Sequence, residues 1–329
     1  MTALLLLASF VLIVGGALLF TNAIEWAGHR LDMGQGAVGS LLAAVGTAMP
    51  ESLIPIVAVL AGAEGTDIAI GAVIGAPFML ATIAMMLVAI SAFAYRERRD
   101  SGREVRSDLP TTTLDLVFFL ALFPVALIVG VLPLPKAADV VIAGLLIVAY
   151  GLYAWRTVKK SEDVQDEADL KPLTFDTSRE DPPNRFQLIG QLVVGLAMII
   201  GGAELFVEEL TVVAESLGIA TLVLALVLAP LATELPEKAN SFLWIRRSKD
   251  SLAVGNITGA MAFQSTIPVA LMLILIDWKL DRYALAAGIV ALIGGAIALW
   301  RLRVRTFGAP AIVVFGSLFV AFIVFVTVA

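Results

Sequence analysis

The sequence predicts an all-α polytopic membrane protein with ten transmembrane helices in two inverted five-helix repeats. Three observations lead to this fold class: an extremely apolar composition, a division into ten apolar stretches, and an alignment between the two halves of the chain. Of the 329 residues, 60% are hydrophobic and 15% charged, and the mean hydropathy is +0.96. Soluble globular domains are far less apolar. We therefore expect a lipid bilayer to be the main partner of this chain.

Each apolar stretch is long enough to cross the membrane as a helix. A hydrocarbon core of about 30 Å takes roughly 20 helical residues. The first stretch lacks a basic leader, and its Gly-Gly-Ala centre recurs inside the chain, so we interpret it as a helix rather than a cleaved signal peptide. The stretches cover residues 3–28, 35–60, 67–95, 112–132, 138–157, 186–214, 218–245, 252–276, 284–301 and 307–328.

The two halves of the chain contain a duplicated segment. At an offset of 186 residues, 15–51 aligns with 201–237 without a gap, and 11 of the 37 paired positions are identical. After a two-residue deletion, 71–75 pairs with 255–259. This identity indicates that one ancestral half was duplicated. With five crossings per half, the two copies run in opposite directions, which is typical of secondary transporters.

The basic residues predict the orientation of the chain. With the N-terminus outside, eighteen Lys and Arg residues lie in inner loops and three in outer loops, which is a strong positive-inside bias. We expect the first repeat over residues 1–157, an acidic inner linker with little fixed structure over 158–185, and the second repeat over 186–329. Both termini are then outside, and the expected location is a bacterial or archaeal plasma (inner) membrane.

Each repeat carries an acidic box inside its second apolar stretch. The boxes read Gly-Thr-Ala-Met-Pro-Glu at 46–51 and Ala-Thr-Glu-Leu-Pro-Glu at 232–237. Proline lacks an amide donor and clashes with the preceding turn, so we expect Pro50 and Pro236 to break or kink their helices. Carbonyl groups freed at that depth are tolerated where they line a cavity or bind a ligand.

The two boxes offer oxygen ligands only. Glu51 and Glu237 would lie in the first turn of a continuing helix, where the positive end of the helix dipole favours an ionised carboxylate. With the hydroxyl groups of Thr47 and Thr233, they form an environment that suits Ca²⁺ or Na⁺. The alternative for a single intramembrane Glu is a protonated side chain bonded to a neighbouring helix, but two related glutamates after proline favour an ion site.

With these boxes, the sequence resembles the Ca²⁺/cation antiporter superfamily, which includes the sodium/calcium exchangers. Repeats of that family read G-T-S-x-P-E and then G-N-x-x-G-S-N-x-x-N/D, and the matching motifs here span 46–80 and 232–264. The resemblance covers nearly the whole chain. It implies ten helices in inverted halves and a site in which Glu51 and Glu237 bind Ca²⁺, with Thr47 and Thr233 oxygens beside them.

Several ion-ligand positions of the family are changed in this chain. Alanine stands where the family has serine at three positions, and two positions have lost the usual Asn or Asp, which removes several presumed Na⁺ ligands. Glu234 occupies the serine position of the second motif and adds a carboxylate. The other changed residues are Ala48, Ala76, Leu80, Ala260 and Gln264.

Lys238 has two possible roles. It lies four residues after Glu234, on the same side of a helix and in the favourable order. In one interpretation its ammonium group neutralises Glu234 or occupies a former Na⁺ site, which leaves Glu51 and Glu237 for one divalent ion or for protons. In the other interpretation it extends toward the cytoplasmic Arg246-Arg247 end. The sequence leaves both open.

The paired glycines at 71–75 and 255–259 also allow two interpretations. Glycines four residues apart let helices approach closely. The family resemblance instead implies that the helices are broken there, which would bring the oxygen atoms of Asn256, Thr258 and Gln264 near the acidic boxes.

We expect a secondary-active antiporter that exchanges Ca²⁺, or a similar divalent cation, for Na⁺ by alternating access. As in the family it resembles, 3–28 and 186–214 would slide against the bundle through their small Gly15-Gly16 and Gly201-Gly202 faces. The alternatives are an H⁺-coupled exchanger and a member that binds cations without transporting them. Clustered polar residues disfavour a channel. The chain lacks Cys, and its single histidine, His29, is near a helix end, so no enzyme motif is expected. No cofactor and no nucleic-acid partner are expected either. The sequence does not specify the oligomeric state.

Overall fold

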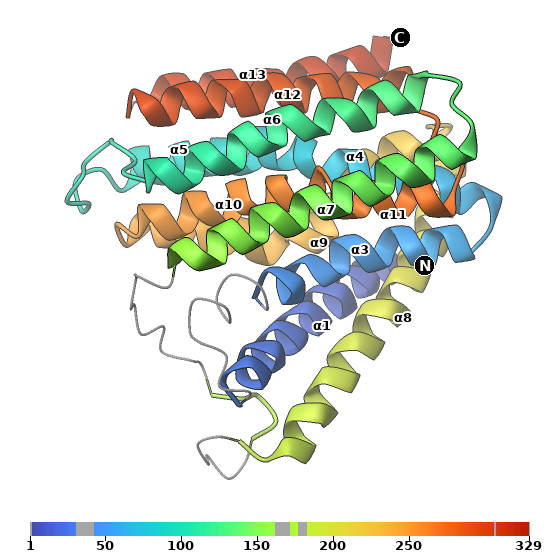
Figure 1. Ribbon diagram of the computed structural model, residues 1–329, viewed down its shortest axis with the longest axis horizontal. Coiled ribbons are helices and arrows are strands. Elements are labelled where there is room, and N and C mark those ends of the chain that lie inside the picture. Colours follow the sequence, from blue (N-terminus) through green and yellow to red (C-terminus); the bar gives the residue numbers. More distant parts are fainter. Residues whose placement is uncertain (1, 31–42, 162–171, 177–182, 306, 329) are drawn as a thin grey trace.

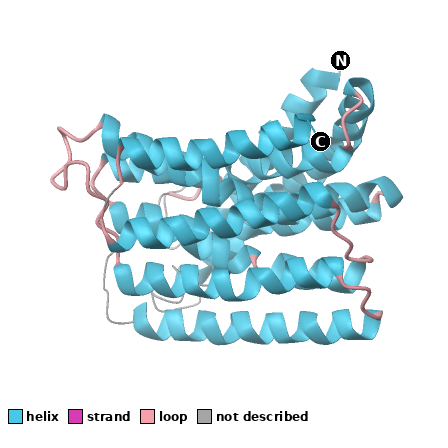
Figure 2. Cartoon of the chain, turned by 90° about the horizontal axis from the view of Figure 1, so that it is seen from above, coloured by secondary structure: helices cyan, strands magenta, loops and turns pink. Residues whose placement is uncertain are grey.

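Helices joined by loops make up the part of the chain that the computed structural model describes, which comprises residues 2–30, 43–161, 172–176, 183–305 and 307–328 (Figure 1). No strand occurs in these residues (Figure 2). Eight helical stretches among them are long and apolar enough to cross a membrane. Two shorter apolar helices cover Glu51–Leu60 and Thr221–Leu235. The prediction of an all-α polytopic membrane protein is therefore confirmed.

The helices coincide with the apolar stretches predicted from hydropathy, although the second stretch is described only from residue 43. In chain order they are α1 (Thr2–Arg30), α3 (Ala43–Leu60), α4 (Ala63–Met79), the π-helix η2 (Leu80–Ala84), α5 (Met85–Ala94), α6 (Leu109–Val131), α7 (Lys136–Ser161), α8 (Arg185–Leu217), α9 (Thr221–Arg246), α10 (Asp250–Gln264), α11 (Ile267–Leu275), α12 (Arg282–Arg303) and α13 (Ala309–Val328).

Most helices lie side by side along one direction, whereas α1 and α8 lie together at a steep angle to the others (Figure 1). Two stretches form the centre of the bundle. In the most apolar windows of 65–94 and 250–275, 78% and 72% of the residues are buried, against 17–44% in the other six candidate spans. The outer helices therefore turn much of their surface toward lipid, and α4 and α10 are enclosed by protein.

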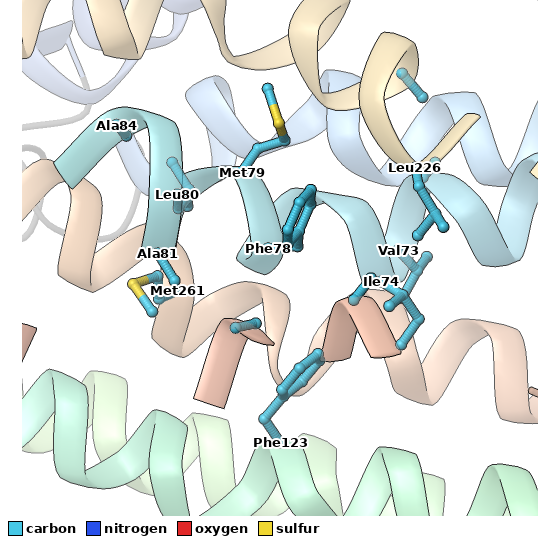
Figure 3. Packing of buried hydrophobic residues seen from close by; sticks show 14 of the residues in the cluster. Val73, Ile74, Phe78, Met79, Leu80, Ala81, Ala84, Phe123, Leu226 and Met261 are labelled. Atoms are coloured by element: carbon cyan, nitrogen blue, oxygen red, sulfur yellow. The ribbon is translucent and has the colours of Figure 1, made fainter. Parts of the chain in front are cut away.

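The centre is packed with apolar side chains around α4. Every residue from 71 to 80 is buried. Figure 3 shows Phe78 and Val73 of α4, with Leu226 of α9, Phe123 of α6 and Met261 of α10 around the same helix. This packing holds the second half of each acidic motif in the interior of the bundle.

The first glycine pair packs α4 directly against the backbone of α9. A Cβ atom added to Gly75 would lie 2.3 Å from the carbonyl oxygen of Leu226, and one added to Gly71 would lie 2.5 Å from the Cβ of Ala225. The packing interpretation of this pair is therefore confirmed. Both α4 and α10 run through their glycine pairs without interruption, so the expectation of helix breaks at these glycines is wrong.

The two central helices instead become irregular immediately after the motifs. The π-helix η2 begins at Leu80, and α10 ends at Gln264, before a turn at Ser265 and Thr266. Leu80 and Gln264 are counterparts in the duplicated halves. Hydroxyl groups cover carbonyl groups at both places, for example from Thr82 to Phe78 at 2.6 Å and from Ser265 to Ala262 at 2.7 Å. These bonds allow irregular backbone inside the bundle.

The helices that carry the acidic boxes continue through their prolines. α3 runs from Ala43 to Leu60 and α9 from Thr221 to Arg246. Of the expected break or kink at Pro50 and Pro236, the break is therefore wrong, and the kink stays a prediction. A proline removes one backbone hydrogen bond. Packing of α9 against α4, α5 and α10 stabilises the helix on both sides of that position.

The small faces of α1 and α8 contact each other, rather than the rest of the bundle as the sequence suggested. A Cβ atom on Gly16 would lie 2.9 Å from the backbone nitrogen of Ile199, and one on Gly202 would lie 3.0 Å from that of Ile13. At the offset of 186, Gly16 corresponds to Gly202 and Ile13 to Ile199. The contact is thus reciprocal between the two repeats.

Part of the linker is docked onto α1 and α8. Leu173 is buried with Ala23, Trp26 and Leu188, and the backbone N–H of Phe175 donates to Oε1 of Gln191 at 2.9 Å. The polar composition predicted little fixed structure, which is wrong for residues 172–176. The acidic stretches at 162–171 and 177–182 lie outside the described residues.

Candidate cation site

The residues proposed from the sequence as cation ligands come from three helices that contact one another, α3, α9 and α10. The side chains of Thr47 and Glu237, like those of the two box prolines, lie outside the described part of the structure. The described members are Glu51 on α3, Thr233, Glu234 and Lys238 on α9, and Asn256 and Gln264 on α10.

Glu234 is buried and bonded through both of its carboxylate oxygens. Its Oε2 lies 2.6 Å from Nζ of Lys238, and its Oε1 accepts a hydrogen bond of 2.9 Å from Nε2 of Gln264. Only 1% of the Glu234 side chain and 4% of the Lys238 side chain are exposed. An ionised group at such a position needs a partner of opposite charge and hydrogen bonds, and Glu234 has both.

The ammonium group of Lys238 turns back toward the start of α9. Besides Glu234, it donates to the carbonyl oxygen of Pro230 at 3.2 Å, eight residues earlier in the chain. Side chains on a helix lean toward its N-terminus, which brings Lys238 over Glu234. The structure therefore shows the paired arrangement and not the alternative in which Lys238 extends toward Arg246 and Arg247.

Gln264 links the ion pair to the end of α10. Its side chain is 2% exposed, and its amide group donates to Glu234. Its Oε1 is buried and has no hydrogen-bond partner among the described residues. A buried amide oxygen without a partner is energetically unfavourable. It is an acceptor that is available to a cation beside the Glu234 carboxylate.

Two further members lie on α3 and α9. Glu51 is buried at 8% exposure on α3, and the Thr233 hydroxyl donates to the Ala229 carbonyl of its own helix at 3.3 Å. Within the described residues, no group of three or more His, Asp or Glu side chains is arranged to hold a metal ion. The pairing of Glu51 with Glu237 that the family resemblance implies remains an expectation, because the Glu237 side chain is outside this set.

Asn256 does not join Glu234. Its Nδ2 lies 3.4 Å from the Ser241 hydroxyl oxygen, and that hydroxyl donates to the carbonyl of Ala253. Eight residues separate Asn256 from Gln264, which is about 12 Å along an α-helix. The structure thus brings Gln264 to the ion pair and places Asn256 more than two turns away.

Another buried carboxylate, which the sequence does not single out, joins three helices. Asp115 on α6 is 2% exposed. The Tyr153 hydroxyl of α7 donates to its Oδ1 at 2.8 Å, and the Thr258 hydroxyl of α10 donates to its Oδ2 at 2.7 Å. The available signal was an acidic residue inside an apolar stretch, since such residues are rare and usually have a specific partner. Thr258 therefore faces Asp115 and not Glu234.

The fold and the buried polar cluster define a helical membrane protein with charged groups held inside its bundle. The chain belongs to the sodium/calcium exchanger protein family. The sequence model of this family matches residues 1–159 and 187–328.

Two curated proteins illustrate the relationship. The chain is 26% identical over 289 residues to the inner membrane protein YrbG of Escherichia coli (strain K12). This alignment covers 85% of the chain and 83% of YrbG. It is 28% identical over 136 residues to CaxA of Alkalimonas amylolytica, a protein named as an antiporter. That match covers 41% of this chain and 43% of CaxA.

Two solved structures share the fold. The crystal structure of the H⁺/Ca²⁺ exchanger CAX has a TM-score of 0.74 at 20% identity, and the match covers 98% of this chain and 81% of CAX. A structure of the sodium-calcium exchanger NCX_Mj has a TM-score of 0.62 at 18% identity and covers 98% and 97% of the two chains. At these identities, the similarity establishes the fold.

Proposed function

We propose that this protein is a secondary-active antiporter that exchanges Ca²⁺, or a similar divalent cation, for Na⁺ by alternating access. The observation that carries the proposal is the buried set of oxygen atoms where α10 ends: the Glu234 carboxylate and the open Oε1 of Gln264. Hard oxygen ligands of this kind suit Ca²⁺ and Na⁺. Family membership and the fold support the same function.

The proposed topology has ten crossings in two inverted repeats, 1–157 and 186–329, joined by the inner linker 158–185. The reciprocal contact of Gly16 with Ile199 and of Gly202 with Ile13 supports this topology, because a pseudo-two-fold axis makes corresponding residues meet in this way. Both termini then face outward from a bacterial or archaeal plasma membrane. The similarity to an inner membrane protein of E. coli supports that location.

In the proposed site, Glu51, Glu237 and Glu234 supply carboxylates, while Thr47, Thr233, Asn256 and Gln264 supply further oxygen atoms. A carboxylate pair can hold one divalent ion or the competing monovalent ions, but not both at once. Mutual exclusion at one site couples the opposite fluxes. Because α1 and α8 are joined by their glycine faces, we propose that they move together against the other helices when the site changes its exposure.

Protons are the second candidate for the coupling ion. The family serines are replaced by Ala48, Ala76 and Ala260, and the Glu234 carboxylate is already paired with Lys238. Fewer oxygen atoms are therefore available to hold Na⁺. Carboxylates alone can bind and release protons in exchange for a divalent ion, so H⁺ is the alternative coupling ion.

Flux into proteoliposomes tests the proposal. Uptake of radioactive Ca²⁺ is measured under an outward Na⁺ gradient and, separately, under an outward proton gradient. We expect uptake that requires the counter-ion gradient and that is abolished in Glu51→Gln, which keeps the side-chain size but removes the charge. The exposed Glu104→Gln serves as the matched control and should leave uptake unchanged. Uptake with the proton gradient alone identifies H⁺ as the coupling ion.

Two results would contradict the antiporter. Uptake that continues without any counter-ion gradient indicates a channel. Absence of uptake with either gradient, together with retained Ca²⁺ binding by the purified protein, indicates a family member that binds cations without transporting them.

A further inference from the structure

Glu234, Lys238 and Gln264 form a polar cluster that exists in only one of the two repeats. They lie on α9 and α10 and contact one another through Glu234. The duplicated first repeat has small or apolar residues at all three corresponding positions, so the charge, its counter-charge and the amide are absent together. These counterparts are Ala48, Ser52 and Leu80.

The ammonium group of Lys238 contacts two oxygen atoms of the kinds that also bind alkali cations. Its contacts are a carboxylate oxygen of Glu234 at 2.6 Å and the backbone carbonyl oxygen of Pro230 at 3.2 Å. Carboxylate and carbonyl oxygens are the ligands that hard cations bind. Lys238 is 3% exposed, so this position is separated from bulk water.

The ion pair lies within a single helix. Lys238, Glu234 and Pro230 all belong to α9, so a shift of α9 as a rigid helix against α3 or α10 does not by itself separate them. The contact of Gln264 with Glu234, in contrast, crosses between two helices. Movement of the helices against one another therefore does not require Glu234 to lose its counter-charge.

We propose that Lys238 is a tethered replacement for one monovalent coupling ion. The inference rests on the proposed antiport and specifies its stoichiometry. The ammonium group fills the place beside Glu234 that Na⁺ would otherwise take, and it cannot leave the protein. Glu234 can still offer an oxygen atom to the proposed site, but its charge is already balanced by Lys238. Among the three carboxylates of that site, only Glu51 and Glu237 then charge-balance the transported ions, and one monovalent ion fewer moves in each cycle. Lys238 is in this sense a specificity-determining residue.

Removing Lys238 should open a Na⁺ site. The substitution Lys238→Met keeps the apolar stem but removes the ammonium, and it leaves a buried carboxylate without a counter-charge. Such a carboxylate is strongly unfavourable and recruits a cation from solution. The double substitution Glu234→Gln with Lys238→Met removes both charges and should recruit none. Lys238→Arg keeps a tethered cation and should also bind no additional Na⁺.

Equilibrium binding of radioactive Na⁺ to the purified full chain tests this directly and does not depend on transport. We expect Lys238→Met to bind one more Na⁺ per chain than the wild type, and the double variant and Lys238→Arg to bind as the wild type does. Equal Na⁺ binding by Lys238→Met and the wild type overturns the inference, since it means that Glu234 takes up a proton instead or that the position is not a cation site.

Thermal unfolding covers the case in which Lys238→Met is unstable. A ligand that binds only the folded state raises the unfolding temperature, so NaCl should raise the unfolding temperature of this variant more than choline chloride at the same ionic strength. An identical response to the two salts overturns the inference.

Transport then separates this inference from the proposed function. In proteoliposomes, the reversal potential of exchange gives the number of monovalent ions that move per divalent ion, and we expect this number to rise by one in Lys238→Met. Absence of exchange in the wild type rejects the antiporter alone, because the Na⁺-binding measurement still decides the role of Lys238. Exchange with an unchanged ion ratio in Lys238→Met rejects the tethered-ion inference alone.

Discussion

Arg99 and Asp250 form a fully buried ion pair between the two halves of the chain. Nη2 of Arg99 lies 2.7 Å from both carboxylate oxygens of Asp250, and their side chains are 0% and 3% exposed. The backbone N–H of Arg106 donates to the same carboxylate at 2.8 Å. Arg99 lies in the connection between α5 and α6, while Asp250 begins α10, where a helix favours an acidic residue. The pair therefore fixes the start of α10 to the first repeat.

Breaking this pair should destabilise the fold strongly. Arg99→Ala leaves the Asp250 carboxylate buried with its main counter-charge removed, and the loss of one partner from a buried pair costs about 3–5 kcal/mol. We expect a clearly lower midpoint of thermal unfolding in detergent. The Arg96–Glu97 pair is the control, because its side chains are 34% and 84% exposed. Glu97→Gln should change stability by less than about 1 kcal/mol, and equal losses in both variants would contradict the assignment.

Tyr153→Phe should destabilise the protein through Asp115. The substitution keeps the ring that stacks on Phe118 but removes the donor to Asp115 Oδ1. An unsatisfied buried acceptor costs about 1–3 kcal/mol, and more when it is charged. Thermal unfolding measures the loss. Tyr150→Phe is the control, since this hydroxyl has no hydrogen-bond partner among the described residues. An unfolding midpoint that drops as far in Tyr150→Phe as in Tyr153→Phe would assign the effect to the ring environment.

Substitution by alanine should change the stability of the protein differently at Gly16 on α1 and at Gly201 on α8. A Cβ on Gly16 would lie 2.7 Å from the carbonyl oxygen of Gly195, whereas one on Gly201 meets no described atom within 4 Å. Gly16→Ala should lower stability by about 1–3 kcal/mol through overpacking. Gly201→Ala should be neutral, or stabilising by up to about 1 kcal/mol, because alanine favours helix. Thermal unfolding of the two variants compares them, and a stable Gly16→Ala protein would show that α1 and α8 can separate freely.

Gln264→Leu should weaken cation binding more than Asn256→Ala. The substitution makes this position like Leu80 in the first repeat and removes both the donor to Glu234 and the open Oε1 oxygen. Loss of one ligand oxygen should lower the apparent Ca²⁺ affinity by about tenfold, which corresponds to about 1.4 kcal/mol of binding free energy. Competition binding with radioactive Ca²⁺ measures both variants. Asn256 faces Ser241, so a larger effect of Asn256→Ala would relocate the site along α10.

Much of the fold could be predicted because hydropathy and duplication act on long segments. The apolar stretches match the helices to within a few residues in most cases, and the offset of 186 residues correctly pairs Gly16 with Gly202 as equivalent contacts. The helix interruptions could not be predicted. Proline and glycine residues predict interruptions, but the packing of α9 outweighs the hydrogen bond lost at Pro236. The irregular backbone depends instead on hydroxyl groups, such as those of Thr82 and Ser265, that bond to particular carbonyl groups.

The candidate site could be predicted in its residues more than in its geometry. The spacing of Glu234 and Lys238 allowed either an ion pair or an extended lysine, and the buried surroundings, which no local pattern reveals, decide between them. Gln264 was proposed as a ligand from the resemblance and does reach Glu234. Asn256 was proposed on the same basis, yet it turns to Ser241, because the two residues lie on different turns of α10. Asp115 could not be predicted as a buried ligand-like group, because it lies outside both acidic boxes and no motif surrounds it.

The reciprocal contact between α1 and α8 has a bearing on the origin of the chain. Gly16 meets Ile199 and Gly202 meets Ile13, so each repeat offers the same residues to the other. A contact of this type is self-complementary, as in a symmetric homodimer. In the proposed inverted-repeat topology, an ancestral half that inserted into the membrane in both orientations would assemble through this same surface, and gene fusion would preserve an interface that already existed. Once two separate copies existed, one could acquire Glu234 and Lys238 while the other kept Ala48 and Ser52.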